Sequence, residues 1–232
     1  MTKNDFLRIT LTRHQKIWGW RYLLFMTVFL SSILGALNWI LPVTLNATQL
    51  NFLFFCANFV AALLIFRTYL LQFLSPDKKQ LLRIAGVSLL FYGLYWIASA
   101  LLGRGIAAID PDFVNQNDAA ISTMSGSHYW LMFLGTVFLV PVTEECFHRG
   151  LIFRGLYDRS PVAAFLVSTA VFCTVHILNY IGNYSLPTLL LCFVQYIPAG
   201  LCLAGAYRLS GSLISPILIH MAVNAVGMLT LR

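Results

Sequence analysis

Charged residues are scarce in this sequence, and glutamate is almost absent. Its two glutamates, Glu144 and Glu145, are neighbours among 232 residues. Only 10% of the residues are charged and 59% are hydrophobic, whereas a soluble domain carries about 25% charged residues. This composition excludes an ordinary soluble domain and indicates a membrane protein.

Cysteine is present, but it follows none of the patterns of a disulfide framework or a cysteine metal site. The cysteines are odd in number, none forms a CxxC pair, and all lie in apolar segments. We therefore predict that all five are buried, unpaired thiols; they are Cys56, Cys146, Cys173, Cys192 and Cys202.

The apolar residues form long runs of the kind that cross a bilayer. The first run, Tyr22 to Leu41, does not end in a small-residue cleavage site, so we interpret it as a retained transmembrane helix rather than a signal peptide. Further runs predict an all-α, polytopic bundle of about seven membrane helices. The predicted helices are 22–41, 50–74, 81–102, 128–157, 161–179, 186–207 and 211–231.

Basic residues are distributed asymmetrically between the connections. The first 21 residues and the links at 75–83, 154–159 and Arg208 carry nearly all of them, and the alternate links carry only Arg104. The positive-inside rule therefore predicts a cytoplasmic N-terminus in a multi-pass protein of the plasma or inner membrane. The net charge of +7 is explained by anionic lipid headgroups, and no nucleic-acid partner is expected.

Three regions follow from these patterns. Residues 1–21 form a basic cytoplasmic leader, residues 22–127 hold the N-terminal transmembrane helices, and residues 128–232 hold the helices with unusual polar residues. The 103–127 stretch is polar, and we predict a plain connector there; the alternative is a surface helix or lid.

Ionisable residues inside membrane helices are costly, so they mark candidate functional sites. At about 1.5 Å per residue, the glutamates lie about 22 Å from the nearest cytoplasmic link. The histidine of the fifth segment lies about 24 Å from its link, and the histidine of the seventh segment about 14 Å. We therefore predict a shared site near mid-membrane. Its candidates are Glu144, Glu145, His148 and Arg149 in the fourth segment, His176 in the fifth, and His220 and Asn224 in the seventh.

Helical spacing separates the two glutamates. Adjacent residues point about 100° apart, whereas residues four apart share a face. Glu145 is thus predicted to pair with Arg149 as a supporting carboxylate, while Glu144, below His148, remains for chemistry. Pro141 removes a backbone donor, frees the Val137 carbonyl and predicts a kink beside the site.

Three motifs in order carry a resemblance to a known family. EECFHR fits EExxxR, FCTVH (from Phe172 to His176) fits FxxxH, and HMAVN fits HxxxN. The sequence over about residues 128–232 thus resembles the CPBP family, also called Abi, of intramembrane proteases related to CAAX prenyl endopeptidases and to bacteriocin-processing and immunity proteins. His148 is a departure, since the family usually has Phe before the arginine.

The resemblance implies a function and roles for single residues. Glu144 would activate the hydrolytic water with help from His176, and His220 and Asn224 would hold that water or stabilise the oxyanion. Glu145 belongs to this catalytic set as the partnered carboxylate, and Arg149, His148 and Phe172 support it. The implied activity is an endopeptidase that hydrolyses a membrane-associated or lipidated peptide or protein.

Some alternatives stay open on the sequence. Zinc is an option, with Glu144, His176 and His220 as ligands, although we favour a site without tightly bound metal. A non-catalytic immunity or peptide-binding protein of the same fold would need the same cavity. A proton-coupled carrier would also place carboxylates and histidines in the membrane, but it predicts paired broken helices, which the sequence does not suggest.

Overall fold

The computed structural model describes residues 10–40, 42 and 44–231, and these are helical with no β-strand. Lys3, Arg8, Leu41 and Arg232 lie outside the described residues. The α-helices are α2 (Arg13–Phe25), α3 (Ser31–Ile40), α4 (Ala47–Leu71), α5 (Lys78–Ile109), α6 (Gln116–Leu134), α7 (Val140–Glu145), α8 (Arg154–Tyr157), α9 (Pro161–Ile177), α10 (Leu186–Gln195), α11 (Ile197–Ser210) and α12 (Ile214–Thr230). Shorter segments join them: π-helical η1 (Met26–Leu30), η2 (Gly135–Leu139) and η3 (Cys146–Phe153), and the 3₁₀ turn η4 (Leu178–Tyr180).

These helices make a multi-pass membrane protein. Among the described residues, six continuous or nearly continuous helical stretches are long and apolar enough to cross a bilayer. The seventh apolar helix, α12, is shorter at 17 residues. The predicted all-α polytopic bundle is therefore confirmed.

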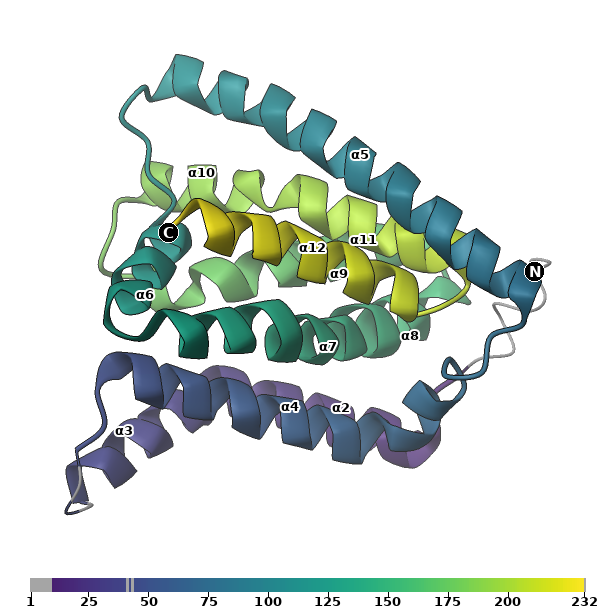
Figure 1. The fold of residues 1–232 in the computed structure, drawn as a ribbon, viewed down its shortest axis with the longest axis horizontal. Helices are drawn as coiled ribbons and strands as arrows, with labels where there is room; N and C mark the ends of the chain where they lie inside the picture. Colours follow the sequence, from purple (N-terminus) through teal and green to yellow (C-terminus); the bar gives the residue numbers. More distant parts are fainter. Residues whose placement is uncertain (1–9, 41, 43, 232) are drawn as a thin grey trace.

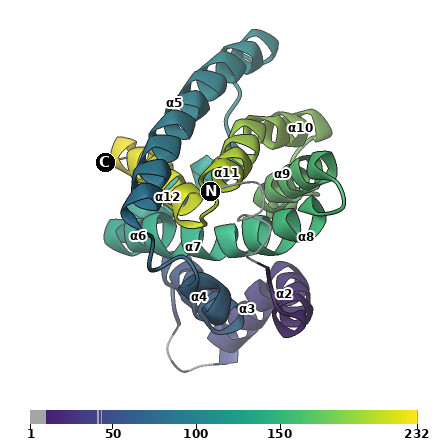
Figure 2. The same cartoon turned by 90° about the vertical axis from the view of Figure 1, so that its right-hand side faces the viewer.

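The bundle is built around the helices that carry the three motifs. Figure 1 shows α12 between α5 and the long α6–α8 rod, with α9 and α11 behind it. Helix α5 contacts α11 and α12, whereas α4 contacts α6 and α7 from the other side. Figure 2 shows α2, α3 and α4 as a separate layer below the rod. The first three spans thus flank the motif helices on two sides.

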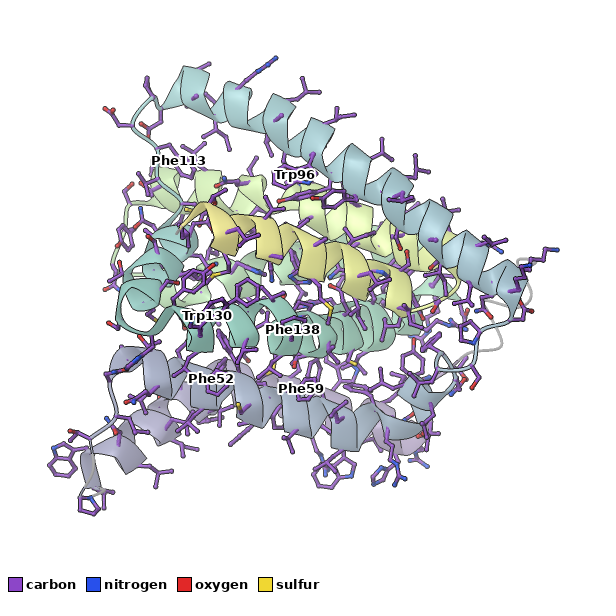
Figure 3. The ribbon with its side chains drawn as sticks, in the orientation of Figure 1. Phe52, Phe59, Trp96, Phe113, Trp130 and Phe138 are labelled. Atoms are coloured by element: carbon purple, nitrogen blue, oxygen red, sulfur yellow. The ribbon has the colours of Figure 1, made fainter. Side chains whose placement is uncertain are left out.

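Apolar side chains cover the outside of the bundle. Large exposed apolar side chains lie along the membrane-spanning helices, and they include Trp130 and Phe138, at 61% and 45% exposed, both labelled in Figure 3. An exposed apolar surface of this extent suits hydrocarbon rather than water.

Basic residues of the connections gather at one end of the bundle. The start of α5, the end of α8 and the α11–α12 turn lie at the same end in Figure 1, and they carry Lys78, Lys79, Arg159 and Arg208. This grouping is what the predicted orientation requires.

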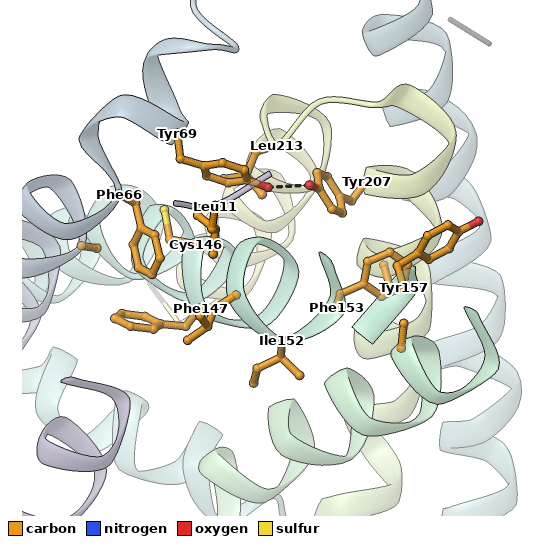
Figure 4. Close-up of a cluster of buried hydrophobic side chains, with 14 of the residues drawn as sticks. Leu11, Phe66, Tyr69, Cys146, Phe147, Ile152, Phe153, Tyr157, Tyr207 and Leu213 are labelled. Carbon is orange, nitrogen blue, oxygen red and sulfur yellow. Dashed lines mark hydrogen bonds between the residues drawn. The ribbon is translucent and has the colours of Figure 1, made fainter. Parts of the chain in front are cut away.

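An aromatic core holds the rod against α4 and α11. Phe147 packs edge-on against Phe66 of α4 with ring centroids 5.2 Å apart. In the same cluster the hydroxyls of Tyr69 and Tyr207 form a buried hydrogen bond of 2.5 Å, drawn in Figure 4. This bond satisfies two buried hydroxyls at once and ties the second span to α11.

Helix boundaries differ from the prediction at two places in the first half. Helix α2 begins at Arg13, inside the predicted leader, because Thr12 caps it with a capping box. The predicted 103–127 connector is wrong for most of its length. Helix α5 continues to Ile109, and α6 begins after its cap Asn115, so only the short 110–115 link joins them. A break at His128, where φ is −148° and ψ is 75°, separates the first part of α6 from the rest.

The sixth segment is broken rather than continuous. Helix α10 ends at Gln195 and α11 starts at Ile197. Pro198 has no amide hydrogen for the preceding turn, which is the physical reason for the break.

The cysteine prediction is also corrected in part. All five are free, but Cys56 and Cys202 are only partly buried.

Close packing of α11 against α9 yields a stability prediction. A Cβ added at Gly200 would lie 2.6 Å from the Cγ2 of Thr169, so the backbones approach through this glycine, as its small-residue spacing with Ala204 predicts. We expect Gly200→Ala to lower the free energy of unfolding by about 1–3 kcal/mol, measured by thermal unfolding in detergent.

Gly86 provides the matched control, because nothing lies within 4 Å of a Cβ added there. Gly86→Ala lies inside helix α5 and should keep or raise the melting temperature. Combining Gly200→Ala with Thr169→Ala should recover part of the loss. Equal melting temperatures for the two single alanine variants would contradict the packing argument.

Candidate active site

Residues of the three motifs meet around one carboxylate oxygen. The Oε2 of Glu144 on α7 lies 3.9 Å from the Nε2 of His176 on α9 and 4.0 Å from the Nε2 of His220 on α12. His176 and His220, which follow Glu144 by 32 and 76 positions in the sequence, thus face the same oxygen. The predicted meeting of the three helices is confirmed.

The second glutamate is fully buried and has two partners. Its Oε1 accepts a hydrogen bond from Nη1 of Arg149 at 3.0 Å and one from Nδ1 of His220 at 2.9 Å. The predicted Glu145–Arg149 pair is therefore present. The link from Glu145 to His220 is not predicted by the sequence, and it connects the supporting carboxylate to a motif histidine on another helix.

Arg149 is held on several sides, which fixes the geometry of the ion pair. Its side chain is fully buried, and its Nη2 donates to the Gly200 carbonyl at 3.1 Å. The guanidinium carbon also lies 4.8 Å from the centre of the Phe172 ring. Phe172 in turn contacts the His176 ring, with centroids 4.6 Å apart. The FxxxH phenylalanine thus separates the charged pair from the imidazole on its own helix.

Hydrogen bonds decide which nitrogen of each histidine carries a proton. Nδ1 of His176 lies 2.7 Å from the Phe172 carbonyl, and a carbonyl only accepts, so Nδ1 carries the hydrogen. The same reasoning gives His220 an Nδ1 hydrogen directed to the Glu145 carboxylate. In both residues Nε2 is therefore the atom presented to Glu144.

The Glu144 oxygen at the centre of this arrangement has no hydrogen-bond partner in the described residues, although it is buried. Buried carboxylate oxygens in native proteins are nearly always hydrogen-bonded. Gaps of about 4 Å to the two Nε2 atoms are too long for direct hydrogen bonds but suit a bridging water. The geometry is therefore that of a site for a small donor such as water.

Asn224 is anchored by an irregular turn of the facing helix. Its Nδ2 donates to the Thr136 carbonyl at 2.8 Å. That carbonyl is free because Val140 donates instead to Gly135, in the π register, and the next residue, Pro141, has no amide hydrogen. The predicted distortion beside Pro141 is present as the π-helical segment η2, and the carbonyl that it leaves to Asn224 is that of Thr136.

His148 is fully buried, and its hydrogen bond is local. Its Nδ1 lies 2.9 Å from the Glu144 carbonyl, four residues earlier in the chain. Its ring packs edge-on against Phe172, with centroids 5.2 Å apart. The imidazole therefore packs as an aromatic ring at the position where the family usually has Phe.

A cavity of about 580 Å³ opens from this cluster. Glu144, His176, His220 and Asn224 line it together with residues of α4, α5, α6, α10 and α11. A volume of this size matches that of small-ligand sites, about 300–1,000 Å³. Residues from the first three spans thus share in the site, together with the motif helices.

Several lining residues are missed by sequence reasoning. Tyr95 lies on α5, Asp118 on α6 and Tyr196 at the α10–α11 break. The sequence places Asp118 in a plain connector, and tyrosines in apolar helices give no signal of their own. Only the capping residue Asn115, which starts α6, could have indicated that Asp118 belongs to a helix.

Zinc is tested by the fit of its three candidate ligands. Among the described residues, no group of three or more His, Cys, Asp or Glu side chains is arranged to hold a metal ion. The oxygen-to-nitrogen separations of 3.9 and 4.0 Å exceed the roughly 3.3 Å expected between ligands about 2.0–2.1 Å from a tetrahedral zinc. As placed, these side chains do not form a zinc site.

The comparison with protein families agrees with the motifs. Residues 126–226 match the family model of Rce1-like type II CAAX prenyl endopeptidases. This stretch of the chain is therefore similar to the Rce1-like domain of the CPBP family, a family of intramembrane endopeptidases. No curated protein matches the chain, and no solved structure does.

The buried ion pair yields a second prediction. Glu145→Gln leaves Arg149 buried without a counter-charge and weakens the hydrogen bond that orients His220. Breaking a buried pair costs about 3–5 kcal/mol, so we expect a large drop in melting temperature in detergent together with loss of peptide cleavage.

The pair between Arg154 and Asp158 is the matched control, since it has the same i,i+4 spacing but its aspartate side chain is 54% exposed. Asp158→Asn should change stability by less than about 1 kcal/mol. A Glu145→Gln protein that keeps the wild-type melting temperature but loses turnover would instead identify Glu145 as the general base.

Proposed function

We propose that the protein is an intramembrane endopeptidase in which Glu144 activates a water molecule for attack on a peptide bond. The observation that carries this proposal is the buried, unpartnered Oε2 of Glu144 facing two imidazole nitrogens. A general base needs a bound proton source within reach of its carboxylate, and this gap has the size for one water molecule.

Each hydrogen bond of the bound water has a role in the proposed reaction. The water donates one hydrogen to Glu144 and the other to the neutral Nε2 of His176. As its oxygen attacks the carbonyl carbon, Glu144 takes the proton and later passes it to the leaving amine nitrogen. Both proton transfers use the same carboxylate, so the site returns to its starting state.

His220 and Asn224 are placed to stabilise the negative oxygen that forms. In the form of His220 that enters the reaction with a hydrogen on both ring nitrogens, Glu145 accepts the Nδ1 hydrogen and the oxyanion accepts a hydrogen bond from Nε2. His220 keeps both hydrogens throughout. The second amide hydrogen of Asn224 is the other donor, since the first is used by the Thr136 carbonyl. Preorganised donors of this kind are a large term in acyl-transfer catalysis.

The substrate class follows from the place of the site. The cavity lies among membrane-spanning helices, so we propose a membrane-associated or lipidated peptide or protein as substrate. The orientation proposed from the basic end of the bundle places the N-terminus in the cytoplasm and the protein in the plasma or inner membrane.

Glu144→Gln tests the proposal directly. The amide keeps the shape of the side chain but cannot accept the water proton, so we expect cleavage to fall by at least about 10²–10⁴-fold. The measurement is cleavage of a lipid-anchored peptide library by purified protein in detergent, with thermal unfolding to verify the fold. Cleavage that survives the substitution would remove Glu144 from the mechanism. Peptide binding without turnover in the wild type would favour the non-catalytic alternative.

Metal dependence gives a separate test. Because the three candidate ligands do not form a metal site as placed, we expect chelator-treated and dialysed protein to keep most of its cleavage activity. Activity that falls with chelator and returns with added zinc, together with stoichiometric zinc lost in His176→Ala and His220→Ala, would make the enzyme a metalloprotease.

A further inference from the structure

Asp118 is an acidic residue inside the same cavity and outside the family motifs. It sits in the first turn of α6, where the cap Asn115 accepts the Asp118 amide hydrogen at 3.2 Å. A carboxylate in the first turn of a helix is stabilised by the helix dipole. Its side chain is nevertheless exposed to the cavity, and no described Lys, Arg or His lies within salt-bridge distance of it.

Contacts between side chains connect Asp118 to the candidate catalytic residues. The rings of His176 and Tyr196 are in contact, with centroids 4.2 Å apart and planes tilted by 32°. The Tyr196 hydroxyl donates to the side chain of Asn115 at 3.2 Å, and Asn115 holds the backbone of Asp118. The Asp118 carboxylate itself interacts electrostatically with His176. Asp118 is thus positioned by the same elements that position His176.

The cavity that Asp118 lines also carries aromatic side chains. Tyr95, Tyr180 and Tyr196 line the cavity and lie within electrostatic range of this carboxylate, and Trp96 lines the same cavity. A cavity that combines a carboxylate with several aromatic rings can recognise a cation through an ion pair and through cation–π contacts.

The charged residues of the cavity lining also favour a cation. Its described lining contains two acidic residues, Glu144 and Asp118, and neither lysine nor arginine. The connection residues Lys78, Lys79, Arg159 and Arg208 lie at the other end of the bundle from the start of α6 (Figure 1). A positively charged group is therefore attracted into the cavity, whereas a carboxylate would find no cation in its lining.

We propose that Asp118 and the tyrosines around it form a subsite for a lysine or arginine side chain of the peptide substrate. An extended peptide advances about 3.3–3.6 Å per residue, and Asp118 is linked to His176 through two side chains. The basic residue would therefore lie within a few residues of the scissile bond. This inference rests on the proposed endopeptidase function and defines the substrate class more narrowly.

The test compares pairs of lipid-anchored fluorogenic peptides that differ only by arginine or citrulline at one scanned position. Citrulline keeps the shape of arginine without its charge. We expect the wild type to cleave the arginine peptide with a kcat/KM about 10- to 100-fold higher at one position, the factor expected for a charge-assisted hydrogen bond. Equal rates at every position would overturn the proposal.

Variants assign this preference to Asp118. Asp118→Asn should lower cleavage of the arginine peptide to the level of its citrulline partner, and Asp118→Glu should keep much of the preference. Asp112→Asn is the control, since Asp112 is exposed and outside the cavity lining, and it should behave as the wild type. A preference that survives Asp118→Asn would also overturn the proposal.

A binding measurement separates this inference from the proposed function. If the wild type cleaves none of the peptides, the endopeptidase proposal fails. Fluorescence anisotropy of the same peptides with protein in nanodiscs then decides the subsite. Tighter binding of an arginine peptide that is lost in Asp118→Asn supports it, and equal binding of arginine and citrulline peptides overturns it.

Discussion

The buried Glu145 carboxylate is the interaction on which the rest of the site depends. One oxygen accepts from Arg149 on the rod and from His220 on α12, and Arg149 reaches on to the α11 backbone at Gly200. One negative charge thus joins three helices in a region where an unpaired charge is costly. Because Glu145 is occupied in this way, its neighbour Glu144 can face the cavity without a direct partner. The different roles proposed for the adjacent glutamates follow from their different surroundings.

Irregular backbone supplies the second constraint. The short helix α7, which carries both glutamates, lies between the π-helical segments η2 and η3, and π-helical turns often occur at functional sites. In η2 the shifted hydrogen bonds and Pro141 together expose the Thr136 carbonyl, which then holds Asn224. A regular α-helix would use that carbonyl internally. The distortion therefore anchors Asn224, the proposed oxyanion donor, which lies on a helix far away in the sequence.

The cavity combines these fixed groups with surfaces from the flanking helices. The charged and polar residues near Glu144 come from the three motifs, whereas α5, α6 and the α10–α11 break add tyrosines and Asp118. In the proposed function, the first set performs hydrolysis and the second set selects the peptide. This separation resembles that of other enzymes, in which conserved chemistry and substrate preference are carried by different parts of the fold.

Much of the fold and of the candidate site could be predicted from the sequence, because these features follow the periodicity of single helices. Long apolar runs determine membrane helices, and i,i+4 spacing determined the Glu145–Arg149 pair, because both depend only on local helix geometry. Three ordered motifs indicated which helices meet and which family the domain resembles. Only the tertiary structure decided that Glu145 binds His220, that the π register frees the Thr136 carbonyl, and that Asp118 lies in the cavity. These depend on rotations and register shifts of packed helices, and a sequence read one helix at a time does not contain them.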